Sequence, residues 1–567
     1  THNNDDDDDD DSGLLMFALP HHQQALSLSS SLSSSSTTTD RDQHDDDDDQ
    51  RHCIHTFHGK TCLMEHSETW KLVENIGTPL SFVAPRPPEA ELITHIAEYL
   101  QEDIQYQVPD NILRGAADTY FSGKTIARLA RICMIADELH KLADADSPSS
   151  PDIQGLYYGD NTDIVTDSII QQSMEAASKV DLPSTEDKDA ALEQLKKGVT
   201  TWLAQSGNAG APYIYDATWG GLINCGCIYD GQGPNGYCNN TFPDCPALSS
   251  VNEDFGNGYY NDHHYHYGYH VYAAAVAAKL DPAWGRQHFD EVLLYIRDFA
   301  NPFEDDQYFP QYRQKDWFLG SSWASGIVSA ENSPHGRNEE SSSEAVSAYE
   351  GVTLFGSAMV DAFTEAMDTT TSKGDVSTIK QKLVTATLIR DSGQLLTATE
   401  ISATNRYWHV WSSETHTNAY PKEYTQPVVG MLYDTMATFQ TWFSPWPVSS
   451  MGIHLIPFTP VAETRDDIEW ATDMYPLYEK ACKTAGDFCV DNGWSILQAG
   501  LLATTTTNNS TNTTSSTSDN THTEALKQAM AIPKKVFDTD GGVGNSMSNT
   551  IWYIATRKKA TSTTSNE

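Results

Sequence analysis

The side chains best suited to chemistry gather in residues 254–269, which read Asp-Phe-Gly-Asn-Gly-Tyr-Tyr-Asn-Asp-His-His-Tyr-His-Tyr-Gly-Tyr. Two acids, Asp254 and Asp262, stand there among glycine, aromatic and histidine residues. A pyranose ring has apolar C–H faces and a rim of hydroxyl groups, so aromatic faces with polar edges are what a sugar site needs. The segment therefore predicts a carbohydrate site in which the pKa of Asp262 depends on how deeply the carboxyl is buried.

The same segment allows two other interpretations. It could be an aromatic structural turn whose histidines are hydrogen-bonded in the core. It could also bind a metal through His263, His264 and His266, but neighbouring histidines on one element point in different directions. Because no ligand from another element is evident, we expect neither a metal nor a cofactor.

A second acidic group lies in residues 337–346, which read Arg-Asn-Glu-Glu-Ser-Ser-Ser-Glu-Ala-Val. Glu340 and Glu344 are four positions apart, so in a helix they share one face and their repulsion shifts their pKa values. Glu339 would then face away from Glu340, because adjacent side chains of a helix diverge by about 100°. The alternative is a solvated first helical turn whose acids favour the helix dipole. The apolar residues that follow indicate instead that the turn faces inward.

Aromatic residues elsewhere offer further sugar platforms. Trp317 and Trp323 have small neighbours, and Asp216 lies in a short turn with Trp219. Each tryptophan could equally be an ordinary core residue, so these positions are candidates for substrate contact and no more.

Several long segments have the periodicity of amphipathic helices. Apolar residues recur at helical spacing in residues 124–139, 190–203, 289–299 and 345–363. No alternation of strands and helices points to a parallel sheet. Such helices with long aromatic-rich connections predict a mainly α, toroidal body, while the apolar run at residues 14–20 predicts a buried strand.

The chain is long and acidic. Its 567 residues are too many for one small core and suggest two or three domains. A net charge of −44 would repel nucleic acid and anionic membranes, whereas a polysaccharide substrate is neutral. The aspartate runs at residues 5–11 and 45–49 and the Thr/Ser/Asn tract at residues 504–522 are typical of disorder. No apolar segment is long enough to span a bilayer.

The nine cysteines favour an oxidising compartment. Four of them, Cys225, Cys227, Cys238 and Cys245, crowd into one stretch, and Cys482 and Cys489 form a second close pair. The spacing of the four lacks the C-x2-C pairs of common zinc sites, so a disulfide-stapled loop is favoured over zinc.

Glycosylation sequons and the first residues of the chain also bear on the compartment. Sequons occur at Asn239, Asn508, Asn509 and Asn512. The chain opens Thr-His-Asn-Asn, without methionine or a charged leader. We therefore expect a truncated or processed N-terminus, in which a signal peptide would not be visible.

Taken in order, the two acidic blocks resemble family 81 of the glycoside hydrolases, the endo-β-1,3-glucanases or laminarinases. Further similar segments are residues 14–22, 81–85, 120–131, 315–317, 322–326, 407–409, 441–443 and 544–557. The resemblance covers roughly residues 12–557 apart from the low-complexity inserts. The long Asp-His-His and Glu-Ser-Ser-Ser-Glu blocks are highly specific together.

The resemblance implies a mainly α fold with three parts. Residues 116–567 would form an (α/α)6 barrel catalytic domain, with a disordered insert near residues 504–522. Residues 67–115 would form a small α/β linker domain. Residues 1–66 would hold low-complexity segments and the C-terminal remnant of an N-terminal β-sandwich.

The resemblance also implies endo-acting hydrolysis of internal β-1,3-glucosidic bonds by inversion. The general acid falls on Asp262, the general base on Glu340, and Glu344 is the neighbouring family carboxylate. Expected substrate contacts are His266, Asp216, Trp219, Tyr260, Trp317, Trp323 and Tyr269. Inversion needs an acid for the leaving oxygen and a base for water on the other face, with the carboxyls ~6.5–9.5 Å apart.

The sequence departs from the family pattern at several points. Most of the sandwich is absent, Ser321 stands where the family usually has histidine, and Glu339 stands where it usually has glutamine. Two rivals stay open: a catalytically inactive β-glucan-binding or structural protein, and a polysaccharide lyase. We expect a monomer that binds β-1,3-glucan and neither nucleic acid nor membrane, located outside the cell or in the secretory pathway, a vacuole included.

Overall fold

The computed structural model describes most of the chain: residues 16–23, 53–56, 58–64, 80–157, 166–204, 210–228, 238, 244–327, 333–370, 372–412, 419–505, 518–537 and 543–558. The chain divides into two compact units. The first comprises Thr1–Asn75 with Ser413–Thr425, and the second Ile76–Ser412 with Gln426–Glu567.

The first unit contains a three-stranded antiparallel sheet in the order β1-β3-β2. Its strands are β1 (Met16–Ala18), β2 (Cys53–Thr56) and β3 (Gly59–Met64). A disulfide joins the paired residues Cys53 and Cys62 across β2 and β3. The strand expected in residues 14–20 is thus confirmed at Met16–Ala18, where Ala18 is buried as predicted but Phe17 is exposed.

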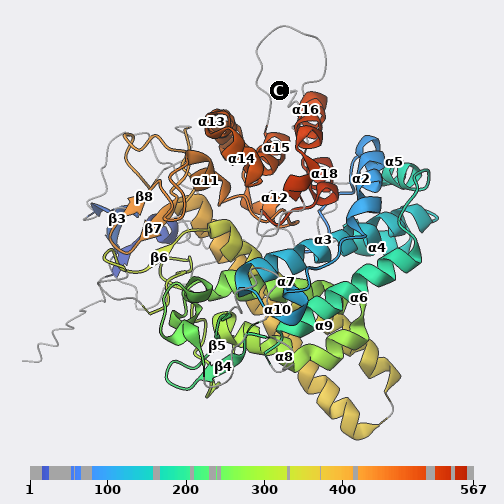
Figure 1. Cartoon of the computed structure of the whole chain (residues 1–567), viewed down its shortest axis with the longest axis horizontal. Helices are drawn as coiled ribbons and strands as arrows, with labels where there is room; N and C mark the ends of the chain where they lie inside the picture. The colour runs from blue at the N-terminus through green and yellow to red at the C-terminus, as the bar shows by residue number, and fades with distance from the viewer. Residues whose placement is uncertain are drawn as a thin grey trace, which may run out of the picture. The chain divides into compact units, whose positions relative to one another are not determined.

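The second unit is mainly helical, which confirms the predicted class (Figure 1). Its α-helices are α2 (Ala90–Asp103), α3 (Thr119–Asp144), α4 (Pro151–Tyr157), α5 (Asp167–Ala177), α6 (Thr185–Trp202), α7 (His263–Leu280), α8 (Pro282–Ala300), α9 (Ser342–Thr369), α10 (Lys373–Tyr407), α11 (Pro447–Gly452), α12 (Ala462–Arg465), α13 (Ile468–Ala485), α14 (Asp487–Asp491), α15 (Trp494–Thr504), α16 (Ser518–Ala531), α17 (Lys534–Phe537) and α18 (Met547–Thr556). Among the described residues, none of the helices has the length and hydropathy of a bilayer-spanning segment.

Short strands and 3-10 turns complete the second unit. The strands are β4 (Tyr213–Asp216), β5 (Gly221–Asn224), β6 (Asn338–Glu339), β7 (Met431–Tyr433) and β8 (Ala437–Thr438), and the turns are η1 (Ile112–Arg114), η3 (Pro246–Leu248) and η4 (Glu253–Tyr259). β4 pairs with β5, and β6, β7 and β8 form a second antiparallel sheet. These strands are too short to form a layer of their own and serve to hold loops.

The four segments with helical periodicity lie in α3, α6, α8 and α9, as predicted. Local sequence explains where three of them begin. Asp118 accepts a hydrogen bond from the Phe121 backbone N–H at the start of α3, and Ser184 forms a capping box with Asp187 at α6. Asp281 caps α8, directly before a proline in the first turn.

The core of the unit is built around α7. From His263 to Ala278 every residue of α7 is buried, and the helix packs against α3, α6, α8 and α9 (Figure 1). A Cβ at Gly268 would lie 2.5 Å from the Cβ of Ala348, so a larger residue would push α9 away. The first residues of α7 and α9 are therefore held in fixed relation by the core.

The long helices α9 and α10 form a hairpin, whose connecting end projects from the rest of the unit in Figure 1. At the other end of the chain, α18 packs against α2, so segments far apart in sequence lie side by side. Buried Glu138 accepts hydrogen bonds from Tyr157 and from the Trp552 indole at 2.6 and 2.7 Å, which ties α3 to both α4 and α18.

Two expected boundaries can be compared with these elements. The expected linker domain at residues 67–115 is described from residue 80 and contains α2 and η1; its separation as a domain stays a prediction. Residues 518–522, which we expected in the disordered insert, lie in α16, whereas residues 506–517 fall outside the described residues.

The cysteines of the second unit form three disulfides: Cys225–Cys245, Cys227–Cys238 and Cys482–Cys489. The disulfide interpretation of the crowded stretch is therefore confirmed, and the zinc interpretation is wrong. Cys133 is a free, buried thiol in α3. The sequons at Asn239, Asn508, Asn509 and Asn512 lie outside the described residues.

Candidate active site

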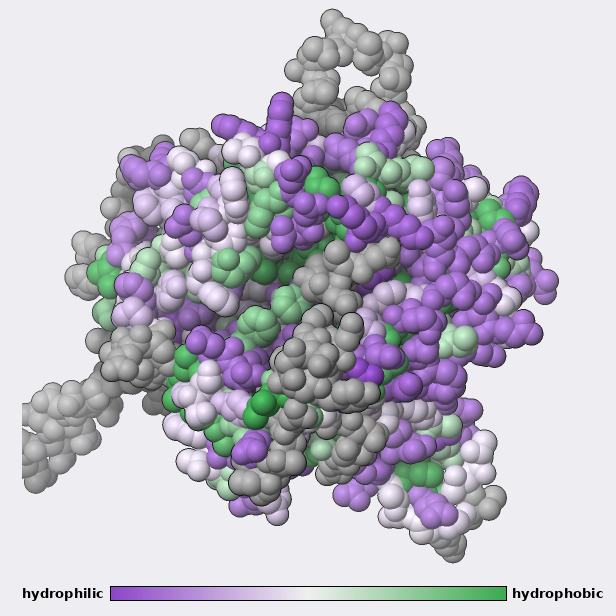
Figure 2. Space-filling model, in the orientation of Figure 1, coloured by the Kyte–Doolittle hydropathy of each residue, from purple (hydrophilic) through white to green (hydrophobic). Residues whose placement is uncertain are grey.

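A cleft of about 330 Å³ opens between the starts of α7 and α9. Four predicted residues line it together: Asp262, His266, Glu340 and Glu344. Its walls are strongly aromatic, with Tyr120, Phe121, Phe255, Trp442, Phe443, Phe488 and Trp494. Figure 2 shows hydrophobic residues in a hollow near the middle of this face, with smaller hydrophobic groups scattered elsewhere among hydrophilic ones. Acids surrounded by aromatic faces are what the sequence predicted for a sugar site.

Asp262 is placed by an unusual backbone. It precedes α7 with a left-handed φ of 60°, and Tyr260, Asp254 and Phe255 also have positive φ, at 64°, 46° and 56°. Such conformations are costly for residues other than glycine and persist only where the surroundings enforce them. The Asp262 backbone N–H donates to Ala324 at 2.8 Å, which fixes the position of the carboxyl at the helix start.

Buried polar contacts hold this segment in shape. The Asn257 side-chain oxygen accepts from the Asn224 backbone N–H at 2.7 Å. The ring of His263 bridges the Asn257 carbonyl at 2.8 Å and Asp298 at 2.5 Å. His263 therefore has a structural role, as one alternative interpretation of the histidine cluster proposed.

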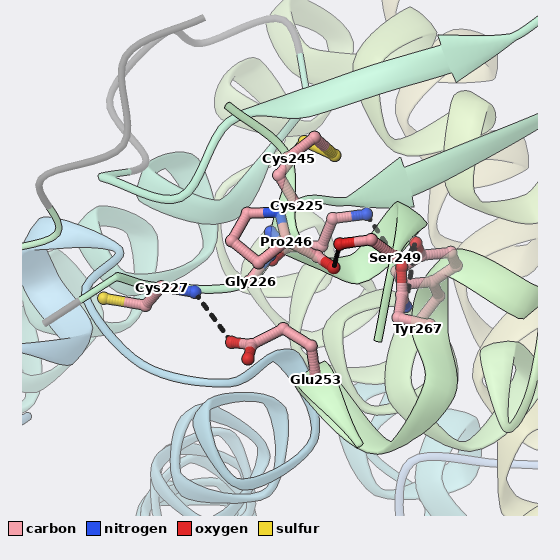
Figure 3. The surroundings of a disulfide bond; sticks show 10 residues. Cys225, Gly226, Cys227, Cys245, Pro246, Ser249, Glu253 and Tyr267 are labelled. Carbon is pink, nitrogen blue, oxygen red and sulfur yellow. Dashed lines mark hydrogen bonds between the residues drawn. A yellow bond between two sulfur atoms is a disulfide. The ribbon is translucent and has the colours of Figure 1, made fainter. Parts of the chain in front are cut away.

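A disulfide holds the chain that leads into the same segment (Figure 3). The Cys225–Cys245 disulfide joins the residue after β5 to the residue before η3. The Cys227 backbone N–H donates to Glu253 at 3.3 Å, at the start of η4. Gly226 has a φ of 76°, and a Cβ there would lie 2.3 Å from Glu253, so this approach requires glycine.

Glu339 and Glu340 do not belong to the helix that was expected to hold them. Both precede α9, and Glu339 pairs with Leu432 of β7 as part of strand β6. The helix-face argument is therefore wrong for these two residues, because Glu339 is paired with β7 and Glu340 lies between β6 and the start of α9. The predicted divergence of Glu339 from Glu340 still holds, because Glu339 contacts Tyr265 and Glu340 contacts Trp442 in the cleft lining.

The two glutamates have different surroundings. Glu339 is buried, accepts from the Tyr265 hydroxyl at 2.6 Å and lies 3.3 Å from His264 Nε2. Glu340 is half-buried in the cleft lining and accepts from the Trp442 indole N–H at 2.8 Å. Only Glu340 of this pair can reach a substrate in the cleft.

Glu344 lies in the first turn of α9 and is buried. The hydroxyls of Tyr120 and Tyr269 donate to it at 2.7 and 2.6 Å, and Lys124 Nζ lies 3.9 Å away. Tyr269 therefore contacts Glu344, which lines the cleft, but Tyr269 is not itself in the described cleft lining.

The serines between the glutamates anchor the start of α9. Ser341 and Ser343 donate to the Ile453 carbonyl at 3.0 and 2.7 Å, and all three serines are buried. Ser342 Oγ lies 3.0 Å from His454 Nδ1. The alternative of a solvated helical turn is thus wrong.

Burial controls the protonation of the two principal acids. It raises the pKa of Asp262 well above its usual range, and the carboxyls of Glu339 and Glu344 raise it further. Burial and then Asp262 also raise the pKa of Glu340, whereas the Trp442 N–H lowers it. The surroundings of the cleft therefore favour the protonated form of these two acids.

His266 is a neutral residue of the lining, because burial lowers its pKa well below the usual range. Its Nδ1 lies 2.6 Å from Thr119 Oγ1, which in turn donates to Asp254 at 2.9 Å. Burial raises the pKa of Asp254 to about 8. Within the described residues, His, Cys, Asp and Glu side chains form no group of three that could hold a metal.

The remaining predicted contacts lie in other places. Tyr260 is buried and donates to Asp216 of β4 at 2.9 Å, while Trp219 is exposed in the turn that follows. Trp323 is buried and Trp317 is exposed. None of these five residues is in the described cleft lining, so their contact with substrate stays a prediction.

Sequence reasoning did not single out the aromatic residues Trp442, Phe443, Phe488 and Trp494 of the cleft lining. Trp442 and Phe443 lie in the similar segment at residues 441–443, which was a usable signal. Phe488 lies in α14, inside the loop closed by the Cys482–Cys489 disulfide, and Trp494 stacks with Phe443 at 6.5 Å. Neither of these last two had a signal in the sequence, because only the fold brings them to the cleft.

The chain is similar to known proteins over most of its length. Residues 171–530 match the model of the glycosyl hydrolase family 81 C-terminal domain. A glucan endo-1,3-beta-D-glucosidase of Glycine max is 28% identical over 468 residues, covering 82% of this chain and 52% of that protein. The primary septum glucan endo-1,3-beta-D-glucosidase of Schizosaccharomyces pombe is 29% identical over 293 residues, covering 51% of this chain and 24% of that protein.

A solved structure has a similar fold. It is a mutant of a family 81 glycoside hydrolase from Clostridium thermocellum, with a TM-score of 0.56 at 18% identity, covering 96% of this chain and 55% of that one. The chain thus spans about half the length, or less, of these relatives.

Proposed function

Since the chain belongs to glycosyl hydrolase family 81, as its motifs predicted, we propose that it hydrolyses internal β-1,3-glucosidic bonds of laminarin-type glucans by inversion. The observation that supports this most is the cleft, where Asp262 from the start of α7 meets Glu340 from the segment before α9 between aromatic walls. Aromatic walls suit the apolar faces of glucose, and paired carboxyls suit the cleavage of a glycosidic bond.

In this mechanism Asp262 is the general acid. It transfers its proton to the glycosidic oxygen as the bond from that oxygen to the anomeric carbon breaks. The raised pKa of Asp262 favours the protonated form that a general acid needs. Asn261 donates to one Asp262 oxygen at 3.0 Å, which leaves the other oxygen to hold the proton.

Glu340 is the general base. It accepts a proton from a water molecule whose oxygen attacks the anomeric carbon from the opposite face, so the product has the α configuration. The hydrogen bond from Trp442 favours the ionised form that a base needs. Glu344, held by Tyr120 and Tyr269, orients substrate or water and couples to Glu340 as a like charge.

The finer architecture is part of the proposal. The helices of residues 116–567 form an (α/α)6 barrel, residues 67–115 form a linker domain, and the small sheet of the first unit is the remnant of a β-sandwich. Support comes from the mainly helical second unit, the antiparallel sheet of the first and the similar fold of the solved relative.

Partners and location follow the same reasoning. The substrate is a neutral β-1,3-glucan bound by a monomer, and a net charge of −44 disfavours nucleic acid and anionic membranes. Four disulfides support an extracellular or secretory location, vacuole included.

Laminarin digestion tests the function. Reducing sugar should appear with mixed oligosaccharides as early products, and proton NMR should detect the α-anomer first. A β-anomer appearing first would mean retention of configuration. Folded protein that binds laminarin and releases no sugar would favour the inactive binder, and an unsaturated product absorbing ultraviolet light would favour a lyase.

A further inference from the structure

Trp442 makes an unusual contact for an exposed side chain. About 66% of its surface is exposed, yet its indole N–H donates to Glu340 Oε2 at 2.8 Å. Its neighbour Phe443 lies edge-on to it at 6.1 Å and stacks with Trp494. Trp442 therefore presents a free aromatic face at the cleft while its edge is directed at the carboxyl.

The two oxygens of Glu340 are not equivalent. Oε2 accepts from Trp442, whereas no group among the described residues donates to the buried Oε1. An ionised carboxylate oxygen without a donor is unfavourable when it is buried, so Oε1 is the oxygen open to a water molecule. The Trp442 contact thus determines which oxygen remains available.

The charges around Glu340 oppose its ionisation. Groups that face it are the carboxyls of Asp262, Glu339 and Glu344, the hydroxyls of Tyr120, Tyr265 and Tyr433, and the Lys124 ammonium, which lies closest to Glu344. The tyrosines Tyr120 and Tyr265 donate to Glu344 and Glu339 rather than to Glu340. The N–H of Trp442 is the described contact that favours ionised Glu340.

We propose that Trp442 is the positioning residue that keeps Glu340 ionised as the base, and that a glucan ring stacked on its indole strengthens this contact. The inference rests on the proposed function, in which Glu340 activates water. A ring on the exposed face would exclude water from the N–H···O contact, and a hydrogen bond to an anion is stronger in a less polar environment. Trp442 thereby couples occupation of the cleft to activation of the base.

The test distinguishes the effect of the Trp442 N–H donor from that of its aromatic face. Trp442→Phe keeps a stacking face and removes the donor, so the pKa of Glu340 rises. The acidic limb of the kcat profile on laminarin should move up by about one pH unit, with kcat on that limb about tenfold lower. KM should change less than about threefold, because stacking is retained. Benzothienylalanine at position 442, in which sulfur replaces the indole N–H and the fused aromatic face is kept, should give the same shift.

Trp446→Phe is the matched control. Trp446 is also exposed, but it stacks with Phe488 at 5.7 Å and is not in the described cleft lining. Its pH profile should coincide with that of the wild-type protein. If Trp442→Phe and the benzothienylalanine variant leave the acidic limb in place, or only raise KM, the inference is overturned while wild-type activity still supports the proposed function. Folded wild-type protein without activity on laminarin at any pH would overturn both.

Discussion

Three neighbouring glutamates have three different environments, and their donors explain why. Glu339 accepts from Tyr265 in the interior, Glu344 accepts from Tyr120 and Tyr269 beside the cleft, and Glu340 accepts only from Trp442 among the described residues. A general base must lie within hydrogen-bond reach of the proton that it abstracts. Among the three, Glu340 is the one with an oxygen left open for water.

Asp262→Asn should abolish most activity without unfolding the protein. The amide keeps the size of the side chain but cannot transfer a proton, and general acid catalysis typically contributes ~10²–10⁴-fold. We expect kcat on laminarin to fall by at least about 100-fold, with an unchanged circular dichroism spectrum. Asp361→Asn, at an exposed acid paired with Lys279, is the control and should retain full activity. Activity of Asp262→Asn within a few-fold of wild type would remove Asp262 from the role.

Azide should distinguish the base from its neighbour. Glu340→Ala removes the group that activates water, and a small anion that needs no activation can take the place of that water. We therefore expect azide to restore turnover of Glu340→Ala and to give an α-glycosyl azide. Glu344→Ala should be impaired but gain little, because Glu344 orients groups and does not accept the proton. Rescue of Glu344→Ala and not of Glu340→Ala would exchange the two roles.

At the scale of elements, the segment from β5 to α7 is held in place by disulfides and by buried hydrogen bonds. Four of its non-glycine residues, Asp254, Phe255, Tyr260 and Asp262, have left-handed backbone. The Cys225–Cys245 and Cys227–Cys238 disulfides hold its beginning, and His263 holds its end. Removing one of these contacts should therefore change the position of Asp262, because the backbone connects them.

Replacing Cys225 and Cys245 together by serine tests the role of their disulfide. The disulfide closes a loop with a sequence separation of 20, for which the loss of chain constraint is about 3 kcal/mol. We expect a lower melting temperature and a reduced kcat, because the strained segment before Asp262 relaxes. The matched pair Cys53→Ser and Cys62→Ser lies in the other unit and should leave kcat unchanged. Equal kcat in both double variants would show that the position of Asp262 does not depend on the Cys225–Cys245 disulfide.

The elements also show what the sequence could predict. Helical periodicity located α3, α6, α8 and α9 because each buries one face along many residues. The two residues of β6 gave no local signal, because their extended form comes from pairing with β7 about 95 residues later. The acids of the cleft stood in dense, recognisable blocks, whereas Phe488 and Trp494 reach it only through the packing of α13 to α15.

The whole molecule combines a large negative charge with buried carboxyls that resist ionisation. Its net charge is −44, so the compact state becomes more self-repulsive as pH rises. Burial raises the pKa of Glu138 and of Glu350 to about 7 and that of Asp254 to about 8. Both features lower the stability of the folded state as pH rises.

Thermal stability should accordingly be greatest at mildly acidic pH. In the unfolded chain these carboxyls titrate near about 4, so between about pH 4 and 8 the unfolded state binds fewer protons than the folded state. The stability present below the unfolded pKa values is therefore lost as pH rises through the folded ones, and the melting temperature should fall steadily from pH 5 to pH 8.

Glu138→Gln removes one of these titrations and should flatten the fall, even if the lost hydrogen bonds to Tyr157 and Trp552 lower the melting temperature at every pH. Glu365→Gln, at an acid whose side chain is 66% exposed, should leave the slope unchanged. A melting temperature that rises between pH 5 and pH 8 would mean that these carboxyls are ionised in the folded protein and stabilised by groups other than those that surround them here.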